Sequence, residues 1–357
     1  MTSAHAMPHS PAPAEIPASR RRRLKSLIGL IALAVCLLLA PAASLGFGSA
    51  AIPFSEAFEI LAGKLLGIGD LSAYDSNIVA IIWLNRVPRI LAAVAVGSIL
   101  GMSGVAMQAV IRNPLAEPYV LGISSGASSG AAAAIIVLGA SSAVAIGGIA
   151  FLGAALATML VLWFGSGRGG STLRLVLAGV AIGFVFQSAT NLIVISANDA
   201  ETAQSVVFWG LGSLTRPSIA QALVLLATAA ILTVGLWLAG PYLDALASGD
   251  ETCIAIGLNP SLLRALILIP VSAGVALAVA NTGGIGFIGL VVPHLMRPII
   301  GYSHRWLIAG TALASALFLL ATDTVARTVL APVEIPIGII TALLGAPLLI
   351  ILTRRMV

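Results

Sequence analysis

Long uncharged segments alternate with short polar ones along most of this 357-residue chain. The segment from Ile90 to Ile111 contains 22 uncharged residues. At 1.5 Å per residue, about 20 apolar residues are enough for a helix to cross a hydrocarbon core of about 30 Å. Arg86 and Arg89 precede this segment and Arg112 follows it. The pattern predicts a membrane-spanning helix with basic residues at both mouths.

The same reasoning predicts ten spans. The uncharged segment from Tyr119 to Gly167 is about twice as long as one crossing needs, and we expect a turn near 139–147 to divide it. The segment from Ala265 to Met296 is interrupted by Asn281-Thr-Gly-Gly284 and is divided into a seventh span and a shorter eighth span. The other predicted spans are 26–55, 90–111, 175–198, 217–243, 306–322 and 335–353.

The distribution of basic residues predicts the orientation of these spans. An even number of spans places both termini on one side, and that side then carries 13 of the 18 Lys and Arg residues. Because short cytoplasmic loops retain Lys and Arg, we place both termini in the cytoplasm. The five basic residues on the other side are Lys64, Arg86, Arg89, Arg216 and Arg327. The predicted fold is an all-α polytopic bundle of ten transmembrane helices with cytoplasmic termini.

Composition agrees with this assignment, because 59% of the residues are hydrophobic and 9% are charged, where soluble domains carry roughly 25% charged residues. Residues 1–25 are rich in Pro, Ala and Ser and end in a basic cluster, so we expect a disordered basic tail before a membrane domain at 26–357. A cleaved signal peptide is the alternative, but the apolar segment exceeds the usual 7 to 15 residues. Basic residues here indicate orientation and give no reason to expect a nucleic-acid partner.

Motifs for catalysis or nucleotide binding are missing. The sequence contains no G-x-x-x-x-G-K-[ST] or H-E-x-x-H pattern. Gly284 to Gly289 matches a dinucleotide fingerprint by letter but follows no strand, and His294 and His304 have no further metal ligands at suitable spacing. We predict no catalytic residue, no metal site and no directly bound cofactor.

Two polar surfaces are candidates for protein contacts. Arg86, Arg89 and Arg327 lie on the side that should be poor in basic residues, where they contact lipid headgroups or dock an acidic partner. On the opposite side, the loop 244–260 predicts one or two amphipathic helices that lie on lipid or, because the loop is acidic, enter a groove of a partner protein. The candidate residues of this loop are Asp244, Asp250, Glu251, Ile254, Gly257 and Leu258.

Small and neutral polar residues occur within the spans. Gly97 and Gly101, like Gly126 and Gly130, have the spacing that allows close helix packing in lipid. Ser124, Ser125 and Ser128 beside them either accompany this packing or line a polar path, and Gln187 and Asn191 join helices or contact a substrate. Asp323 is the only carboxylate that we expect close to a span, which disfavours an ion-coupled secondary carrier.

Five segments, in the same order along the chain, resemble the permease subunits of ATP-binding-cassette importers for iron-siderophore chelates, haem and cobalamin. The resemblance extends from about Arg86 to the C-terminus. These segments are Arg86-Val-Pro-Arg89, Asn113-Pro-Leu-Ala-Glu-Pro118 with Leu121-Gly-Ile-Ser-Ser-Gly126, Trp209 to Leu214, Gly286-Phe-Ile-Gly-Leu-Val-Val-Pro-His294, and Glu334-Ile-Pro-Ile-Gly338 with Gly345-Ala-Pro347.

The resemblance implies a homodimer around a central path in a bacterial cytoplasmic membrane. Two ATPase subunits inside would bind ATP and Mg, and a periplasmic or lipid-anchored substrate-binding protein would dock outside. Arg86, Arg89 and Arg327 would receive carboxylates of the binding protein, and the loop 244–259 would contact the ATPase. The fifth span, with Ser171 and Thr172 in the preceding turn, would form a cytoplasmic gate.

We therefore expect an importer permease that moves a ferric siderophore without changing it chemically. Haem and cobalamin are alternative substrates, and an ion-coupled secondary carrier is the alternative from another class. Several positions depart from the family pattern, including Ser248, Cys253 and Ser303, and these departures leave the identity of the ATPase partner open.

Overall fold

The computed structural model describes residues 18–48, 52–165 and 172–354, and the regular elements within these ranges are all helices. Seven of them are long and apolar enough to cross a membrane, and three shorter apolar helices complete the set. The ten predicted spans are therefore confirmed. The crossing helices are α1 (Ala18–Leu45), α4 (Val87–Ile111), α5 (Ile123–Ala132), α6 (Ala143–Gly165), α7 (Thr172–Ile195), α9 (Ile219–Leu238), α12 (Pro260–Thr282), α13 (Ile288–Ile300), α14 (His304–Ala326) and α15 (Ile337–Arg354).

The other helices lie at the two ends of the bundle. At the end that the charge distribution places outside are α2 (Phe54–Leu66), η1 (Leu71–Ala73), α3 (Ser76–Ala80) and α8 (Ala200–Gly210). At the cytoplasmic end are α10 (Gly240–Ser248) and α11 (Asp250–Ala255), which confirms the two short helices predicted for the loop 244–260. Three further helical turns are η2 (Ile81–Arg86), η3 (Pro118–Leu121) and η4 (Ala133–Val137).

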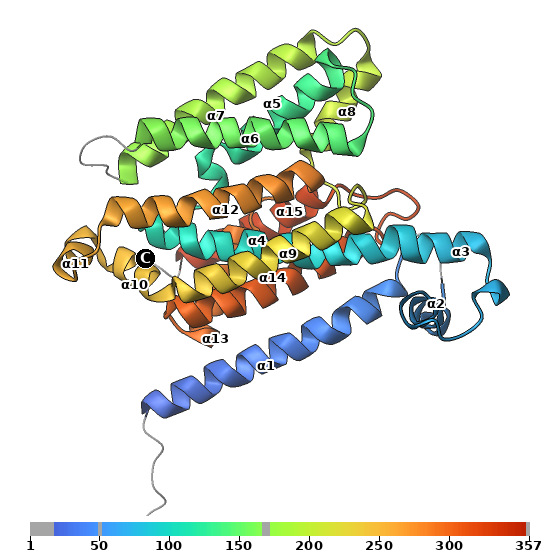
Figure 1. The fold of residues 1–357 in the computed structure, drawn as a ribbon, viewed down its shortest axis with the longest axis horizontal. Coiled ribbons are helices and arrows are strands. Elements are labelled where there is room, and N and C mark those ends of the chain that lie inside the picture. The colour runs from blue at the N-terminus through green and yellow to red at the C-terminus, as the bar shows by residue number, and fades with distance from the viewer. Residues whose placement is uncertain (1–17, 49–51, 166–171, 355–357) are drawn as a thin grey trace, which may run out of the picture.

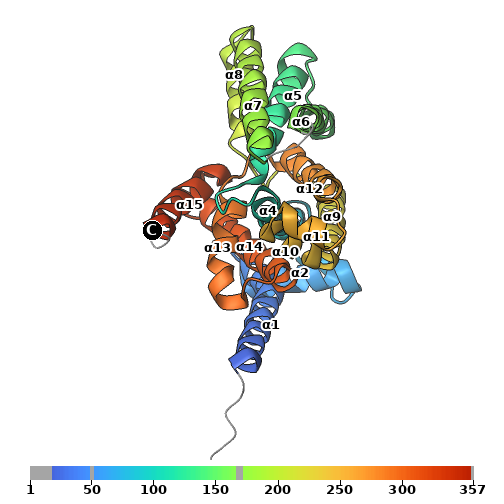
Figure 2. The ribbon, with the colours of Figure 1, turned by 90° about the vertical axis from the view of Figure 1, so that its left-hand side faces the viewer.

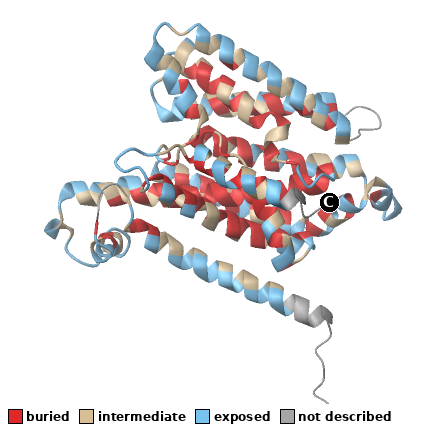
Figure 3. Cartoon of the chain, turned by 180° about the vertical axis from the view of Figure 1, so that it is seen from behind, coloured by how far each residue is buried: buried red, intermediate tan, exposed pale blue. Residues whose placement is uncertain are grey.

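Helix α4 occupies the centre of the molecule, with α9, α12, α13 and α14 packed around it (Figures 1 and 2). Nearly all of its residues from Pro88 to Ile111 are buried, and the buried residues of the whole chain concentrate around it (Figure 3). A helix that is apolar on all sides is stable in such a position because every face is covered by protein. The span from Ile90 to Ile111 is thus the core of the fold.

Glycines allow the neighbours of α4 to approach closely. A Cβ atom on Gly101 would lie 2.0 Å from Ser315 Oγ in α14, and one on Gly104 would lie 1.8 Å from the carbonyl oxygen of Gly289 in α13. A Cβ atom on Gly126 or Gly130 of α5 would lie 2.5 or 2.4 Å from a backbone carbonyl oxygen of α6. The close-packing interpretation of these glycines is confirmed.

The helix that contains α4 begins earlier than we predicted. α3, η2 and α4 form one continuous helix from Ser76 to Ile111, 36 residues long, which corresponds to about 54 Å. Arg86 and Arg89 therefore lie inside a helix and not at its mouth. The π-helical turn η2 immediately precedes Pro88, whose missing N–H group interrupts the regular hydrogen bonds of the continuous helix at this point.

Peripheral helices form two separate groups. α5, α6, α7 and α8 pack together as a lobe on one side of the central helices, and α1 lies on the other side (Figures 1 and 2). α1 contacts chiefly α14 and α13, so much of its apolar surface is exposed. It ends at Leu45, ten residues before the end of the uncharged segment, because glycines at 46 and 48 and Pro53 follow. Residues 1–17 of the expected tail lie outside the described ranges.

Two short helices start inside the membrane. α13 has 13 residues and a length of about 20 Å, which is less than the hydrocarbon thickness. Its first residue follows an unwound segment, 283–287, after the end of α12. α5 similarly follows the irregular segment 112–122. Non-helical backbone at this depth must be satisfied by other parts of the protein.

Candidate functional site

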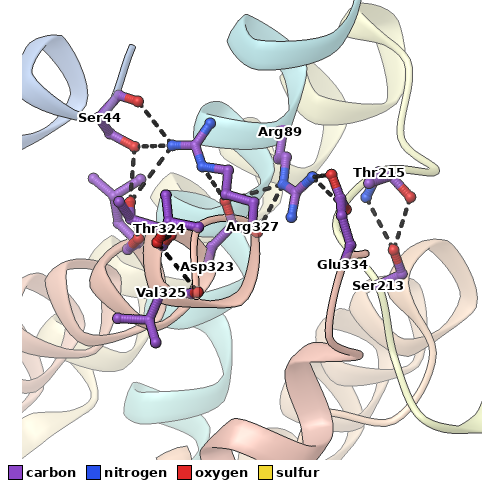
Figure 4. Close-up of polar contacts among 11 residues, drawn as sticks. Ser44, Arg89, Ser213, Thr215, Asp323, Thr324, Val325, Arg327 and Glu334 are labelled. Carbon is purple, nitrogen blue, oxygen red and sulfur yellow. Dashed lines mark hydrogen bonds and ion pairs between the residues drawn. The ribbon is translucent and has the colours of Figure 1, made fainter. Parts of the chain in front are cut away.

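The predicted outer arginines lie near one another between α4, α14 and the connection before α15, and Figure 4 shows Arg89 and Arg327 with their acidic partners. Arg89 Nε donates to Asp323 Oδ1 and Oδ2 at 2.8 and 3.0 Å. Its Nη1 donates to both carboxylate oxygens of Glu334 at 2.8 and 2.7 Å. One guanidinium group therefore joins a buried acid on α14 to a half-exposed acid near the start of α15.

The other two arginines complete this cluster. Arg327 Nη2 donates to the carbonyl oxygen of Ser44 at 2.8 Å, and its Nε lies 3.7 Å from Asp323 Oδ2. Arg86 Nη1 donates to the carbonyl oxygen of Leu45. The end of α1 is thereby fixed to α3–α4 and α14. We call Arg86, Arg89, Arg327, Asp323 and Glu334 the outer cluster.

The structure brings the three predicted docking residues together but buries them. Arg86, Arg89 and Arg327 are 4%, 5% and 2% exposed. Side chains buried this deeply neither extend into lipid headgroups nor face the outer solvent. We had expected these arginines to lie exposed at the outer surface. Their hydrogen bonds inside the chain compensate for the cost of burying charge. Asp323 and Glu334 are the partners that sequence reasoning did not identify.

A polar hollow of about 290 Å³ lies beside the outer cluster. Arg89 and Glu334 form one wall, and the segment 212–216 forms another. Arg216 in this segment donates to the carbonyl oxygens of Trp209 and Phe208 at 3.3 and 3.2 Å. Burial lowers the pKa of Arg216 to about 10, so it stays charged at neutral pH. The hollow is thus lined by two cations, Arg89 and Arg216, and by one anion, Glu334.

At the opposite end, acidic side chains attach α10 and α11 to the spans. Asp250 Oδ1 accepts from Arg264 Nη2 at 2.5 Å and lies 3.6 Å from Arg112 Nη2. Asp244 Oδ1 lies 2.5 Å from His304 Nδ1 and accepts from the His304 backbone N–H at 3.1 Å. These contacts link the two short helices to α4, α12 and α14. α10 and α11 are therefore connected directly to the bundle by side-chain contacts.

The remaining predicted residues of the loop point outward or shape the turn. Ile254 is 64% exposed, and Glu251 is also exposed. Gly257 has a φ of 78°, which glycine adopts without strain, and ends α11, while Leu258 is partly buried. Cys253 lies on the buried face of α11. Ile256 is 60% exposed beside Ile254, and neighbouring exposed apolar side chains, rather than single ones, are typical of a protein contact.

The predicted path residues are divided between two environments. Ser124, Ser125 and Ser128 of α5 are partly buried inside the lobe, and Ser125 Oγ donates to the Gly122 carbonyl oxygen. Gln187 and Asn191 are exposed on α7 and hydrogen-bond to each other at 3.1 Å. The structure therefore separates the serines from the exposed amides.

The predicted gate residues are only partly covered by the structure. Thr172 begins α7 and is partly buried. Ser171 lies outside the described residues.

Two side chains of the segment 112–122 hold the unwound segment 283–287, and sequence reasoning missed them. Glu117 Oε1 accepts from the backbone N–H of Phe287 at 2.8 Å. The Tyr119 hydroxyl donates to the carbonyl oxygen of Ile285 at 2.9 Å and accepts from its N–H at 3.0 Å. Phe287 has a φ of 69°, a left-handed conformation that is uncommon for a residue other than glycine. Glu117 is thus a second carboxylate at membrane depth, besides Asp323.

A larger, mainly apolar hollow of about 670 Å³ lies on the other side of Phe287. It is lined by the end of α8, by Gly284 and Gly286, and by α15 from Gly338 to Pro347. Phe287 packs so closely on Gly345 that a Cβ there would lie 2.4 Å from the Phe287 Cβ. The unwound segment is therefore part of a wall between the bundle core and an open face.

The geometry provides no arrangement for covalent chemistry in the described part of the chain, where no group of three or more His, Cys, Asp or Glu residues could hold a metal ion. Its polar clusters instead connect helices at the two ends of a ten-span bundle. Such a fold and such clusters define a membrane permease whose ends are linked to its spans.

Comparison with known proteins identifies the family. The model of the FecCD transport family matches residues 33–355, and the chain belongs to this family. Members are transmembrane permease subunits of ATP-binding-cassette importers, in which a separate subunit hydrolyses ATP.

Three similar proteins illustrate the match. An iron chelatin transport system permease of Helicobacter pylori is 40% identical over 280 residues, which are 78% of this chain and 84% of the relative. The hemin transport system permease HmuU of Yersinia pestis is 41% identical over 286 residues, 77% of this chain and 83% of the relative. A solved metal-chelate type ABC transporter in an inward-facing conformation has a TM-score of 0.79 and 31% identity, covering 91% of this chain and 98% of that one.

Proposed function

We propose that this chain moves a ferric siderophore across a bacterial cytoplasmic membrane, without changing it chemically, while a partner ATPase binds ATP and Mg. The observation that carries this proposal is the two-ended architecture. A cluster of arginines lies at the outer end, and a pair of helices with exposed apolar side chains lies at the cytoplasmic end. The names of the relatives, which specify iron chelatin and hemin, support an iron chelate as the substrate. Haem and cobalamin are the alternative substrates.

Two copies of the chain enclose the path in this proposal. Gln187 and Asn191 lie among exposed apolar side chains of α7, such as Phe184 and Leu192. Lipid tails cannot hydrogen-bond to amides, so this face is better suited to a second copy or to a watery path. The exposed face of α15, with Leu343, borders the hollow of about 670 Å³. We assign α7 and α15 to the walls of the path, with Ser124, Ser125 and Ser128 behind them.

The substrate-binding protein docks on the outer cluster in this proposal. Acidic side chains of that protein would pair with Arg86, Arg89 and Arg327. Because these arginines are already hydrogen-bonded inside the chain, docking involves an exchange of partners and not the neutralisation of exposed cations. The gate formed by the start of α7, with Ser171 and Thr172, would lie at the opposite end of the path.

The ATPase contacts α10 and α11 in this proposal. Replacing Ile254 with Glu places a charge on the exposed apolar side of α11, and we expect the ATPase to be lost when the permease is purified through an affinity tag. Tyr302→Glu is a matched control, because Tyr302 is also exposed and apolar at the cytoplasmic end but lies outside these helices. Equal recovery of the ATPase with Ile254→Glu and with the unchanged chain would contradict the assignment.

Proteoliposomes that contain the permease, its ATPase and its binding protein test the function as a whole. Uptake of a siderophore loaded with radioactive iron should require ATP and the binding protein. Parallel assays with haem and with cobalamin distinguish the alternative substrates. Uptake that persists without the ATPase but collapses when an ion gradient is removed would establish a secondary carrier and overturn the proposal.

A further inference from the structure

Glu334 differs from the other carboxylate that binds Arg89. The Asp323 side chain is 1% exposed, whereas the Glu334 side chain is 40% exposed although both of its oxygens accept from Arg89 Nη1. Asp323 belongs to the helix α14, and Glu334 belongs to the non-helical connection between α14 and α15. The Nε edge of the Arg89 guanidinium is therefore bound by a buried acid, Asp323. Its Nη1 edge is bound by Glu334, which is partly exposed on the connection between α14 and α15.

The surroundings of Glu334 provide more positive charge and more hydrogen-bond donors than one carboxylate requires. The hollow of about 290 Å³ beside it is lined by Arg89, Arg216, Ser213 and Thr215. The hydroxyl groups of Ser213 and Thr215 hydrogen-bond to each other at 2.8 Å, so one of the two O–H groups remains as a donor for this space. Two cations and one hydroxyl donor around one half-exposed acid leave room and charge for a second carboxylate.

We propose that Glu334 is a resident carboxylate that occupies the place taken by an acidic side chain of the substrate-binding protein on docking. This inference rests on the proposed docking function. The incoming carboxylate displaces Glu334 from Arg89, and Glu334 turns into the solvent that it already partly contacts. Arg89 stays paired throughout, so the exchange avoids the cost of leaving a buried cation without a partner.

The segment that carries Glu334 leads into the membrane-spanning helix α15 and is hydrogen-bonded to the lining of the hollow. Three residues after Glu334, the backbone N–H of Ile337 donates to the Gly212 carbonyl oxygen at 3.2 Å, and the N–H of Gly338 donates to the Leu211 carbonyl oxygen at 3.1 Å. These bonds join the start of α15 to the segment that lines the hollow. Release of Glu334 therefore acts on a connection that leads directly into α15, whose other residues border the larger hollow.

The test measures binding of the substrate-binding protein encoded with this permease to the permease–ATPase complex in nanodiscs. Glu334→Gln removes the competing charge while preserving the shape of the side chain, and we expect affinity to rise about fivefold, the upper range for exposed ion pairs. Glu201→Gln is the matched control, because Glu201 is an exposed outer acid in the first turn of α8. An equal rise in both variants, or no rise in Glu334→Gln, overturns the inference and leaves the docking proposal intact.

A variant that lacks Arg89 distinguishes the docking proposal from the displacement of Glu334. Arg89→Gln removes the cation that both acids bind, while Asp323 keeps Arg327 within ion-pair distance and is not left without a counter-charge. We expect this variant to bind the substrate-binding protein at least tenfold more weakly, and the further change Glu334→Gln to have no effect in it. Unchanged affinity of the Arg89→Gln variant would overturn the docking proposal itself. A rise on adding Glu334→Gln in this background would overturn only the displacement of Glu334 from Arg89.

Discussion

At the scale of single residues, the outer cluster shows how three guanidinium groups are accommodated inside a membrane protein. Asp323 is its centre, because it accepts from Arg89 and lies within ion-pair distance of Arg327. Backbone carbonyl oxygens at the end of α1 satisfy further N–H groups of Arg86 and Arg327. The cluster thereby links α1, α4 and α14 through one buried carboxylate.

Replacing Asp323 with Asn should destabilise the protein strongly. The change leaves two buried cations without their shared counter-charge, and breaking a buried pair in this way costs about 3 to 5 kcal/mol. Thermal unfolding of the purified permease in detergent should show a large fall in Tm. Glu334→Gln is the control and should cost about 1 kcal/mol or less, because Glu334 is half-exposed. Similar losses for both variants would show that Asp323 is not the centre of the cluster.

We expect Glu117 to stabilise the fold as a hydrogen-bond acceptor, and we expect its negative charge to contribute little. Glu117→Ala leaves the Phe287 N–H without its partner at membrane depth, which should cost about 1 to 3 kcal/mol. Glu117→Gln retains an oxygen acceptor and should stay close to the unchanged chain. Thermal unfolding and substrate uptake in proteoliposomes together measure both effects. If the Gln variant were as damaged as the Ala variant, the carboxylate charge itself would be required.

Sequence reasoning could identify these residues only incompletely. The rule that basic residues are scarce outside drew attention to Arg86, Arg89 and Arg327, but it could not show that they are buried. Arg89 and Asp323 are 234 positions apart, and no periodicity reports a contact over that distance. Glu117 lies in a short polar segment between two predicted spans, and hydropathy could not show that its side chain contacts the Phe287 backbone 170 positions away.

At the scale of helices, the tightest constraint is the contact between α4 and α13. Gly104→Ala would place a Cβ 1.8 Å from a backbone oxygen that cannot move without displacing α13. Overpacking of this kind costs about 1 to 3 kcal/mol or more. The yield of folded permease and its Tm should both fall. Gly235→Ala on α9, where no heavy atom lies within 4 Å of the new Cβ, should be neutral or slightly stabilising. A harmless Gly104→Ala would contradict this packing.

The spans were predictable because lipid imposes both length and composition on them. The ends of the spans were not predictable, because an apolar segment ends at the first charged residue whereas the helix can continue beyond it. The segment 76–89 contains Asn85 and two arginines and lies outside the predicted span, yet it is helical, with Arg86 and Arg89 on its buried side. The short α13 was anticipated from the Asn281-Thr-Gly-Gly284 interruption, since glycines there disfavour a helix.

At the scale of the whole molecule, sidedness is the property on which all partner assignments depend. In a chain whose Cys36 and Cys253 are replaced by Ala, a cysteine at Lys64 should react with a membrane-impermeant maleimide in intact cells. A cysteine at Ser248 should react only after permeabilisation. Both positions are exposed, and they lie on α2 and α10 at opposite ends of the bundle. Labelling of both from the same side would exclude the proposed orientation.

The 36-residue helix from Ser76 to Ile111 has a consequence for how a large partner can approach. Measured from its cytoplasmic end, Arg89 lies 22 residues along the helix, at a height of about 33 Å, close to the outer boundary of the hydrocarbon. The 13 residues beyond it raise α2 and its neighbours about 20 Å higher, past the headgroups. A globular partner therefore contacts protein that projects beyond the lipid headgroups, and it reaches the arginines without displacing phospholipids.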